Sequence, residues 1–136
     1  MEASRVIIVE DDTLVAKVLS RTFEGAGFHV TLAGNGEKAW PLLKQSRFDV
    51  MICDINMPKM SGQELCTRLC AEGTPLPPCT LIATSRSEYE QRSWVKEISG
   101  VRLLEKPVGP KQLLQVVRER LEAPACGVGP SPGERP

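Results

Sequence analysis

The sequence has no net charge, because its 17 lysine and arginine residues equal its 17 aspartate and glutamate residues. A basic excess would favour nucleic acid or an anionic membrane as a partner, and this balance favours neither. No apolar run approaches the roughly 20 residues of a membrane span, and no signal-peptide pattern precedes the first predicted strand. We therefore expect a cytoplasmic protein with one domain, since 136 residues are enough to bury one core.

The five cysteines include no CxxC pair. Cys66 and Cys70 have the i, i+4 spacing of one helix face, but no histidine or further cysteine nearby completes a zinc site. We interpret the cysteines as small buried apolar side chains.

Apolar runs alternate with helical periodicities along the chain. Strands are expected at 5–9, 28–33, 50–53, 79–83 and 101–104. The five helices expected after them carry their apolar positions at Leu14, Val15, Val18, Leu19 and Phe23; Ala39, Leu42 and Leu43; Leu65, Cys66, Leu69 and Cys70; Trp94, Val95 and Ile98; and Leu113, Leu114, Val117 and Leu121. Residues 1–122 form the predicted domain, and the Pro- and Gly-rich segment 123–136 is expected to be a disordered tail or a linker.

Three local features bear on where the helices begin. Asp12 or Thr13 is the expected cap of the first helix. Ser61 and Glu64 have the spacing of a capping box, which predicts a helix start near Ser61. Pro41 falls within the second helix, where an interior proline costs about 3 kcal/mol. We therefore expect that helix to start late, to kink or to be irregular.

Alternation of five strands with five helices is typical of the α/β class. It predicts a single doubly wound domain, with an open parallel sheet, right-handed crossovers and helices on both faces. If the strand order is 2-1-3-4-5, ligands bind at the carboxyl ends of the strands, between the first and third.

Polar residues follow four of the predicted strands. Glu10 and Asp11 follow the first strand, and Asp54 follows the third. Thr84 follows the fourth strand, and Lys106 follows the fifth. In the strand order above they converge on one cleft. Carboxylates a few ångströms apart repel by about 4 kcal/mol per pair at an effective dielectric constant of about 20. A divalent cation relieves this repulsion, and an all-oxygen site suits Mg²⁺, with Mn²⁺ as a substitute.

The predicted metal ligands are Asp54, Asp11 and the backbone carbonyl of Asn56. Glu10 is a further predicted ligand that acts partly through water. Lys106 can pair with Asp54 or with an incoming anion, and the Thr84 hydroxyl is a further donor. A carboxylate nucleophile, a hard metal ion and two donors for a new anion together indicate phosphoryl transfer to Asp54.

Across residues 5–122 the chain resembles the CheY-like receiver domain of the two-component response-regulator family, which has a flavodoxin-like fold. The residues that carry the resemblance are Glu10-Asp11, Asp54 in Asp-Ile-Asn-Met-Pro with Gly62 downstream, Thr84 and Lys106-Pro107. The resemblance implies that Asp54 accepts a phosphoryl group from a histidine kinase or a small phosphodonor, that Mg²⁺ is required and that the Lys106–Pro107 peptide is cis.

The resemblance also implies partners. The phosphoryl group would come from a sensor histidine kinase or a histidine phosphotransfer protein, and the output would be a downstream protein target or an output domain of the same protein. Phosphorylation would rearrange the face formed by the fourth helix, fifth strand and fifth helix, which is also the expected homodimer surface. We expect no direct nucleic-acid or membrane contact, and no enzymatic activity beyond the chain's own phosphorylation and dephosphorylation. His29, the only histidine, is no phosphohistidine relay.

Leu103 departs from the family pattern, which often has Tyr or Phe three residues before the lysine. The phosphoryl chemistry should persist. Either the loop around Ser85-Arg86-Ser87 carries the coupling to output, or the aromatic element is absent and the coupling is weak. Two alternatives remain: a phosphate-independent interaction module, which Leu103 supports, and a metal-dependent hydrolase. The hydrolase lacks a second nucleophile or general base for an external substrate.

Overall fold

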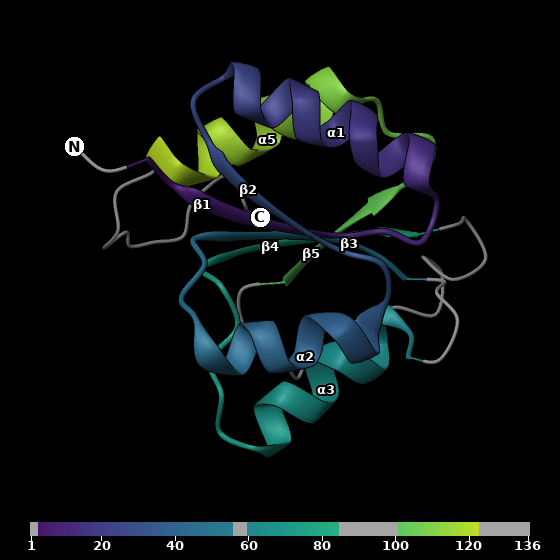
Figure 1. Cartoon of the computed structure of the whole chain (residues 1–136), viewed down its shortest axis with the longest axis vertical. Helices are drawn as coiled ribbons and strands as arrows, with labels where there is room; N and C mark the ends of the chain where they lie inside the picture. The colour runs from purple at the N-terminus through teal and green to yellow at the C-terminus, as the bar shows by residue number, and fades with distance from the viewer. Residues whose placement is uncertain (1–2, 56–59, 85–100, 123–136) are drawn as a thin grey trace.

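A computed structural model of the chain describes residues 3–55, 60–84 and 101–122 (Figure 1). The strands in this part are β1 (Arg5–Val9), β2 (His29–Ala33), β3 (Val50–Asp54), β4 (Cys79–Thr84) and β5 (Val101–Glu105). Its helices are α1 (Thr13–Gly25), α2 (Gly36–Gln45), α3 (Gly62–Ala71) and α5 (Pro110–Glu122). The predicted helix after Ser87, the predicted tail and Asn56 lie outside the described residues.

The five strands form one parallel sheet of order β2-β1-β3-β4-β5. In Figure 1, α1 and α5 cover one face of this sheet, and α2 and α3 cover the other. The predicted α/β class, doubly wound architecture and strand order are therefore confirmed. Among the described residues, no helix has the length and apolar character needed to cross a membrane.

Alternate strand residues face opposite layers of the fold. On β1 and β3, Ile7, Val9 and Met51 belong to the cluster that packs with α2 and α3, whereas Ile8 and Ile52 pack with α1 and α5. Asp54 comes two residues after Ile52, and Glu10 comes two residues after Ile8. The alternation therefore directs both acids to the α1–α5 side, at the carboxyl edge of the sheet.

Side-chain caps explain where two of the helices begin. Asp12 caps α1, because its Oδ1 accepts hydrogen bonds from the amides of Leu14 at 3.0 Å and Val15 at 3.3 Å. In α3 the Ser61 hydroxyl accepts from the Glu64 amide at 3.1 Å, while the Glu64 carboxylate accepts from the Ser61 amide at 3.0 Å. The predicted capping box and the predicted Asp12 cap are both confirmed.

The expectation that Pro41 would delay the start of α2 was wrong. The helix begins directly after Asn35, whose side chain accepts a hydrogen bond from the Lys38 amide at 2.9 Å, and it continues through Pro41. Tertiary contacts offset the missing amide donor, since Ala39 and Leu43 on this helix are buried in the core.

Trp40 links α2 to the end of α3. Its indole nitrogen donates to the Glu72 carboxylate at 3.1 Å, and the Arg68 guanidinium lies 3.9 Å from the centre of its ring. Lys44 lies over the same ring at 4.8 Å and pairs with Glu72 at 3.3 Å. Trp40 therefore packs between α2 and the end of α3.

Two residues predicted to face the core do not. Cys70 is exposed, although Leu65, Cys66 and Leu69 on the same helix are fully buried. Leu121 in the last turn of α5 is also exposed. Both residues lie in the last turn of their helix.

Candidate functional site

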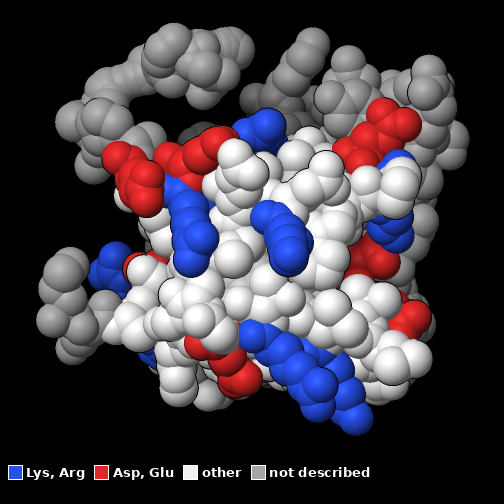
Figure 2. All heavy atoms as spheres, turned by 90° about the horizontal axis from the view of Figure 1, so that it is seen from above, with Lys and Arg blue, Asp and Glu red and all other residues white. Residues whose placement is uncertain are grey.

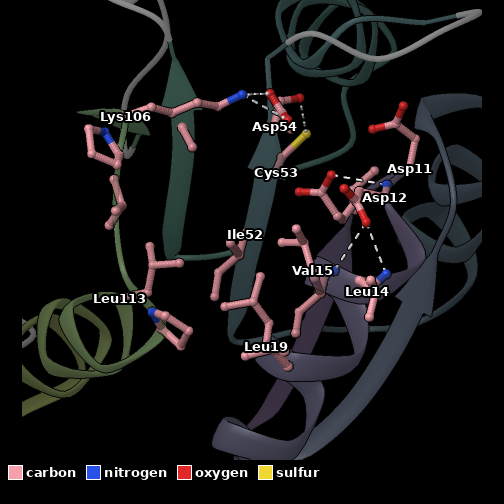
Figure 3. A pocket seen from close by; sticks show the side chains of 18 residues that line it. Asp11, Asp12, Leu14, Val15, Leu19, Ile52, Cys53, Asp54, Lys106 and Leu113 are labelled. Carbon is pink, nitrogen blue, oxygen red and sulfur yellow. Dashed lines mark hydrogen bonds and ion pairs between the residues drawn. The ribbon is translucent and has the colours of Figure 1, made fainter.

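Three acidic side chains meet at the carboxyl edge of the sheet (Figure 3). Glu10 and Asp11 follow β1, and Asp54 is the last residue of β3. β1 and β3 are neighbours with Val9 opposite Cys53, so the next residues, Glu10 and Asp54, come side by side. Each of the three acids has a carboxylate oxygen within 4.8 Å of the other two. The three acids that follow the predicted first and third strands therefore lie together in the structure.

Lys106 completes the charged group from the other side. Its ammonium donates to both carboxylate oxygens of Asp54, at 2.9 and 3.0 Å. The Lys106 amide donates to the carbonyl of Thr84 at 2.8 Å, which ties the exit of β5 to the end of β4. The Lys106–Pro107 peptide bond is cis, as predicted. The backbone at this edge thus places Lys106 so that its side chain reaches across β4 to Asp54.

Thr84 ends β4, the strand between β3 and β5, and is fully buried. Ala83 lies opposite Asp54, and its carbonyl accepts from the Ile55 amide at 2.9 Å. Thr84 therefore sits one residue beyond the phosphoacceptor candidate on the adjacent strand. Of the predicted site residues, only Asn56 lies outside the described part of the chain.

The electrostatics of the acidic group favour a proton or a cation. Burial raises the pKa of the Glu10 carboxyl, and the neighbouring carboxylates of Asp54 and Asp11 raise it further. The Asp12 amide, which donates to Glu10 at 3.1 Å, opposes this rise. The donor set consists of carboxylate oxygens, which suit a hard divalent cation better than zinc. The residues present therefore fit the predicted Mg²⁺ or Mn²⁺.

The acids and Lys106 form one end of a cleft of about 870 Å³. In Figure 3, Leu19, Ile52 and Leu113 line the part of the cleft away from the charged groups, between α1 and α5. The wall on the α1 side includes Leu14, Val15 and Val18, which are 71%, 42% and 48% exposed. The sequence predicted these three residues only as apolar positions of the first helix. Their periodicity predicted the helix but could not distinguish a buried face from an exposed one.

Two residues discussed above stand apart from the cleft. Leu103 on β5 is partly buried against the core cluster of the α2–α3 side and does not line the cleft. His29 is the exposed first residue of β2, at the opposite end of its strand from the acids. Neither side chain contacts the groups proposed to react.

Glycine at position 62 allows α3 to approach the backbone of the site. A β carbon there would lie 3.1 Å from the Asp54 carbonyl oxygen and 3.1 Å from the Ile55 α carbon. The Gly62 amide donates to the Ile55 carbonyl at 3.0 Å. The Cys53 thiol lies on the same side of the strand, 3.3 Å from the position of a β carbon on Gly62. It donates to the Asp54 carbonyl at 3.3 Å, and burial raises the pKa of this thiol well above its usual range. Close packing thus surrounds the peptide that follows Asp54.

Comparison with solved structures finds the same fold in several receiver domains. The chemotaxis response regulator CheY4 of Vibrio cholerae has a TM-score of 0.74 at 29% identity, over 87% of this chain and 98% of that one. The Francisella response regulator 1452 receiver domain has a TM-score of 0.74 at 26% identity, over 86% and 95%. The receiver domain of the hybrid histidine kinase CckA has a TM-score of 0.70 at 27% identity, over 88% and 100%.

Sequence comparison gives the same family. The response regulator MprA of Mycobacterium sp. (strain KMS) is 31% identical over 126 residues, which are 93% of this chain and 54% of the relative. MprA of Mycolicibacterium vanbaalenii is 32% identical over 129 residues, which are 93% and 55%. The chain therefore spans about half the length of these curated relatives. The family profile of the response regulator receiver domain matches residues 6–118. The chain belongs to the response regulator receiver domain family of two-component signalling.

Proposed function

We propose that Asp54 is the phosphoacceptor of a two-component phosphorelay, and that its donor is a sensor histidine kinase or a histidine phosphotransfer protein. The observation that carries this proposal is the position of the Asp54 carboxylate between two other acids and the Lys106 ammonium, 2.9 Å away. A carboxylate in this setting has a cation on one side and a candidate metal site on the other, which are the groups that phosphoryl transfer to a carboxylate requires.

In the proposed reaction, a carboxylate oxygen of Asp54 attacks the phosphorus. The phosphorus–nitrogen bond to the donor histidine breaks, and its electron pair remains on the imidazole. Lys106 moves its hydrogen bonds from the Asp54 carboxylate to the new phosphoryl oxygens, and the Thr84 hydroxyl donates another. Glu10, Asp11, Asp54 and the Asn56 carbonyl would hold Mg²⁺, for which Mn²⁺ can substitute. The bound ion would neutralise charge on the phosphoryl oxygens.

The donor protein would contact the exposed apolar residues of α1 that border the acids. Figure 2 looks onto the α1–α5 side of the molecule, where uncharged atoms occupy much of the middle of the face. Leu14, Val15 and Val18 are exposed there and also line the cleft that contains Asp54. An apolar surface beside a reacting group suits a protein partner that must bring its own histidine to Asp54.

The output is proposed to pass through the α4-β5-α5 face, where α4 denotes the helix predicted after Ser87. The same face would carry a homodimer. The target is a downstream protein or a further domain of the same protein, and the length of the curated relatives leaves room for such a domain. We propose 1–122 as the receiver domain, followed by a tail or linker at 123–136. Self-catalysed dephosphorylation and a cytoplasmic location stay predictions.

The test is incubation of the full chain with a small phosphodonor and Mg²⁺, followed by intact-mass measurement. We expect a gain of one phosphoryl group that Asp54→Asn and removal of Mg²⁺ both abolish. If no donor gives a gain, the alternative, a phosphate-independent interaction module, is favoured, as Leu103 at the usual aromatic position would suggest. Steady turnover of a generic phosphate ester would instead support a hydrolase.

A further inference from the structure

Gly36, the first residue of α2, makes the closest approach found at any described glycine. A β carbon at this position would lie 2.7 Å from the carbonyl oxygen of Met60, 2.8 Å from its β carbon and 3.0 Å from its γ carbon. Two of these atoms have no freedom to rotate away, because one belongs to the backbone and the other is attached to it. Met60 is itself only 6% exposed. Only a residue without a side chain lets α2 rest against Met60.

Met60 is closely connected to the peptide that follows Asp54. It precedes Ser61, the cap of α3, and Gly62, whose amide donates to the Ile55 carbonyl at 3.0 Å. The α carbon of Gly62 is packed so tightly that an added β carbon would lie 3.1 Å from the Asp54 carbonyl oxygen. The start of α2 therefore supports Met60, and the start of α3 supports the backbone of Asp54.

We propose that Gly36 is a positioning residue for phosphoryl transfer to Asp54; this inference rests on the proposed function. Gly36 does not line the cleft and acts through Met60 and Gly62. A methyl group at position 36 would push Met60 away from α2 and shift the start of α3 with it. The Asp54 backbone would lose its packing against Gly62. Its carboxylate would then move relative to Glu10, Asp11 and Lys106.

Gly36→Ala is an informative variant because its local and long-range effects differ in sign. Within a helix, alanine is favoured over glycine by its intrinsic propensity. A change that affected only α2 would therefore leave the stability equal or higher. The positioning role predicts a different result, a defect at the metal and phosphoryl site in a protein that remains folded.

The experiment compares the full chain with Gly36→Ala and with the control Gly25→Ala, at the end of α1, where an added β carbon meets no atom within 4 Å. Three quantities are measured: the maximal rate and half-saturating concentration for a small phosphodonor, the Mg²⁺ dissociation constant by calorimetry, and the urea midpoint. We expect Gly36→Ala to lower the maximal rate at least tenfold and to weaken Mg²⁺ binding severalfold. Gly25→Ala should match the unmodified chain in both.

One further variant keeps the test decisive. If Gly36→Ala does not fold, Met60→Ala reduces the same contact without adding an atom, and should weaken Mg²⁺ binding in a folded protein.

The inference is overturned if folded Gly36→Ala keeps the rate and the Mg²⁺ affinity of the unmodified chain. It is also overturned if the rate falls only in proportion to the unfolded fraction, because that is a purely structural effect, or if Met60→Ala leaves Mg²⁺ binding unchanged. If the unmodified chain accepts no phosphoryl group at all, the proposed function fails first and this inference fails with it.

Discussion

Replacement of Lys106 by methionine probes the charge balance of the site, since methionine keeps an apolar stem but removes the ammonium. The ammonium lies 2.9 Å from Asp54, and the side chains are 40% and 12% exposed, respectively. Two charges about 3 Å apart attract by about 5 kcal/mol at an effective dielectric constant of about 20. Because solvent screens the exposed lysine, we expect a loss of only about 1 kcal/mol in the free energy of unfolding without metal.

Metal binding should respond in the opposite direction. Glu10, Asp11 and Asp54 keep their oxygens within 4.8 Å of one another, and loss of the ammonium leaves this cluster more negative. About 1 kcal/mol of added attraction corresponds to an approximately fivefold lower dissociation constant for Mg²⁺. Phosphorylation of Asp54 should nevertheless become slower, because the ammonium no longer stabilises charge on the phosphoryl oxygens.

The assay combines urea unfolding in a chelator, calorimetric titration with Mg²⁺, and the rate of phosphorylation by a small donor. Lys111→Met is the matched control, because Lys111 is an exposed lysine on α5 that does not line the cleft. It should change none of the three measurements. Weaker or unchanged Mg²⁺ binding in Lys106→Met, or an unchanged phosphorylation rate, would refute the assignment of the ammonium to this site.

Two further predictions concern the same edge of the sheet. Burial raises the pKa of Glu10, so the folded protein binds this proton more tightly than the unfolded chain does. The free energy of unfolding of the protein, measured by urea titration without metal, should therefore fall as the pH rises from the ordinary carboxyl pKa to the raised pKa of Glu10. Glu10→Gln should make this fall smaller. An identical pH dependence in the variant would count against the raised pKa of Glu10. Ser61→Ala removes one half of the α3 capping box and should lower the free energy of unfolding by about 1 kcal/mol, whereas the exposed-site change Thr67→Ala in the same helix should cost less. Equal losses in these two variants would show that the cap contributes little.

Much of the site could be predicted because it depends on strand ends. A short apolar run followed by a carboxylate or a lysine gives both the strand and the place where its side chain leaves the sheet. Parallel pairing then brings Glu10 beside Asp54. Lys106 follows the strand two places further along the sheet, and its side chain lies within hydrogen-bonding distance of Asp54. These contacts follow from the order of the strands and need no knowledge of how the side chains pack.

Features that depend on packing between layers could not be predicted in this way. The periodicity of α3 did not reveal that Cys70 lies outside the core, and the cost of Pro41 did not reveal that caps and buried neighbours would let α2 start at Gly36. The contact of Gly36 with Met60 joins two elements whose spacing no local pattern reports. Such contacts are a property of the assembled fold.

The most direct test of the central claim is to locate the phosphoryl group on the chain. The phosphorylated protein would be trapped by chemical reduction of its acyl phosphate, digested and mapped by mass spectrometry. The account predicts a single modified residue, Asp54, whose labelling needs Mg²⁺ and is lost in Asp54→Asn. Modification at His29 or at another carboxylate, with Asp54 untouched, would contradict it.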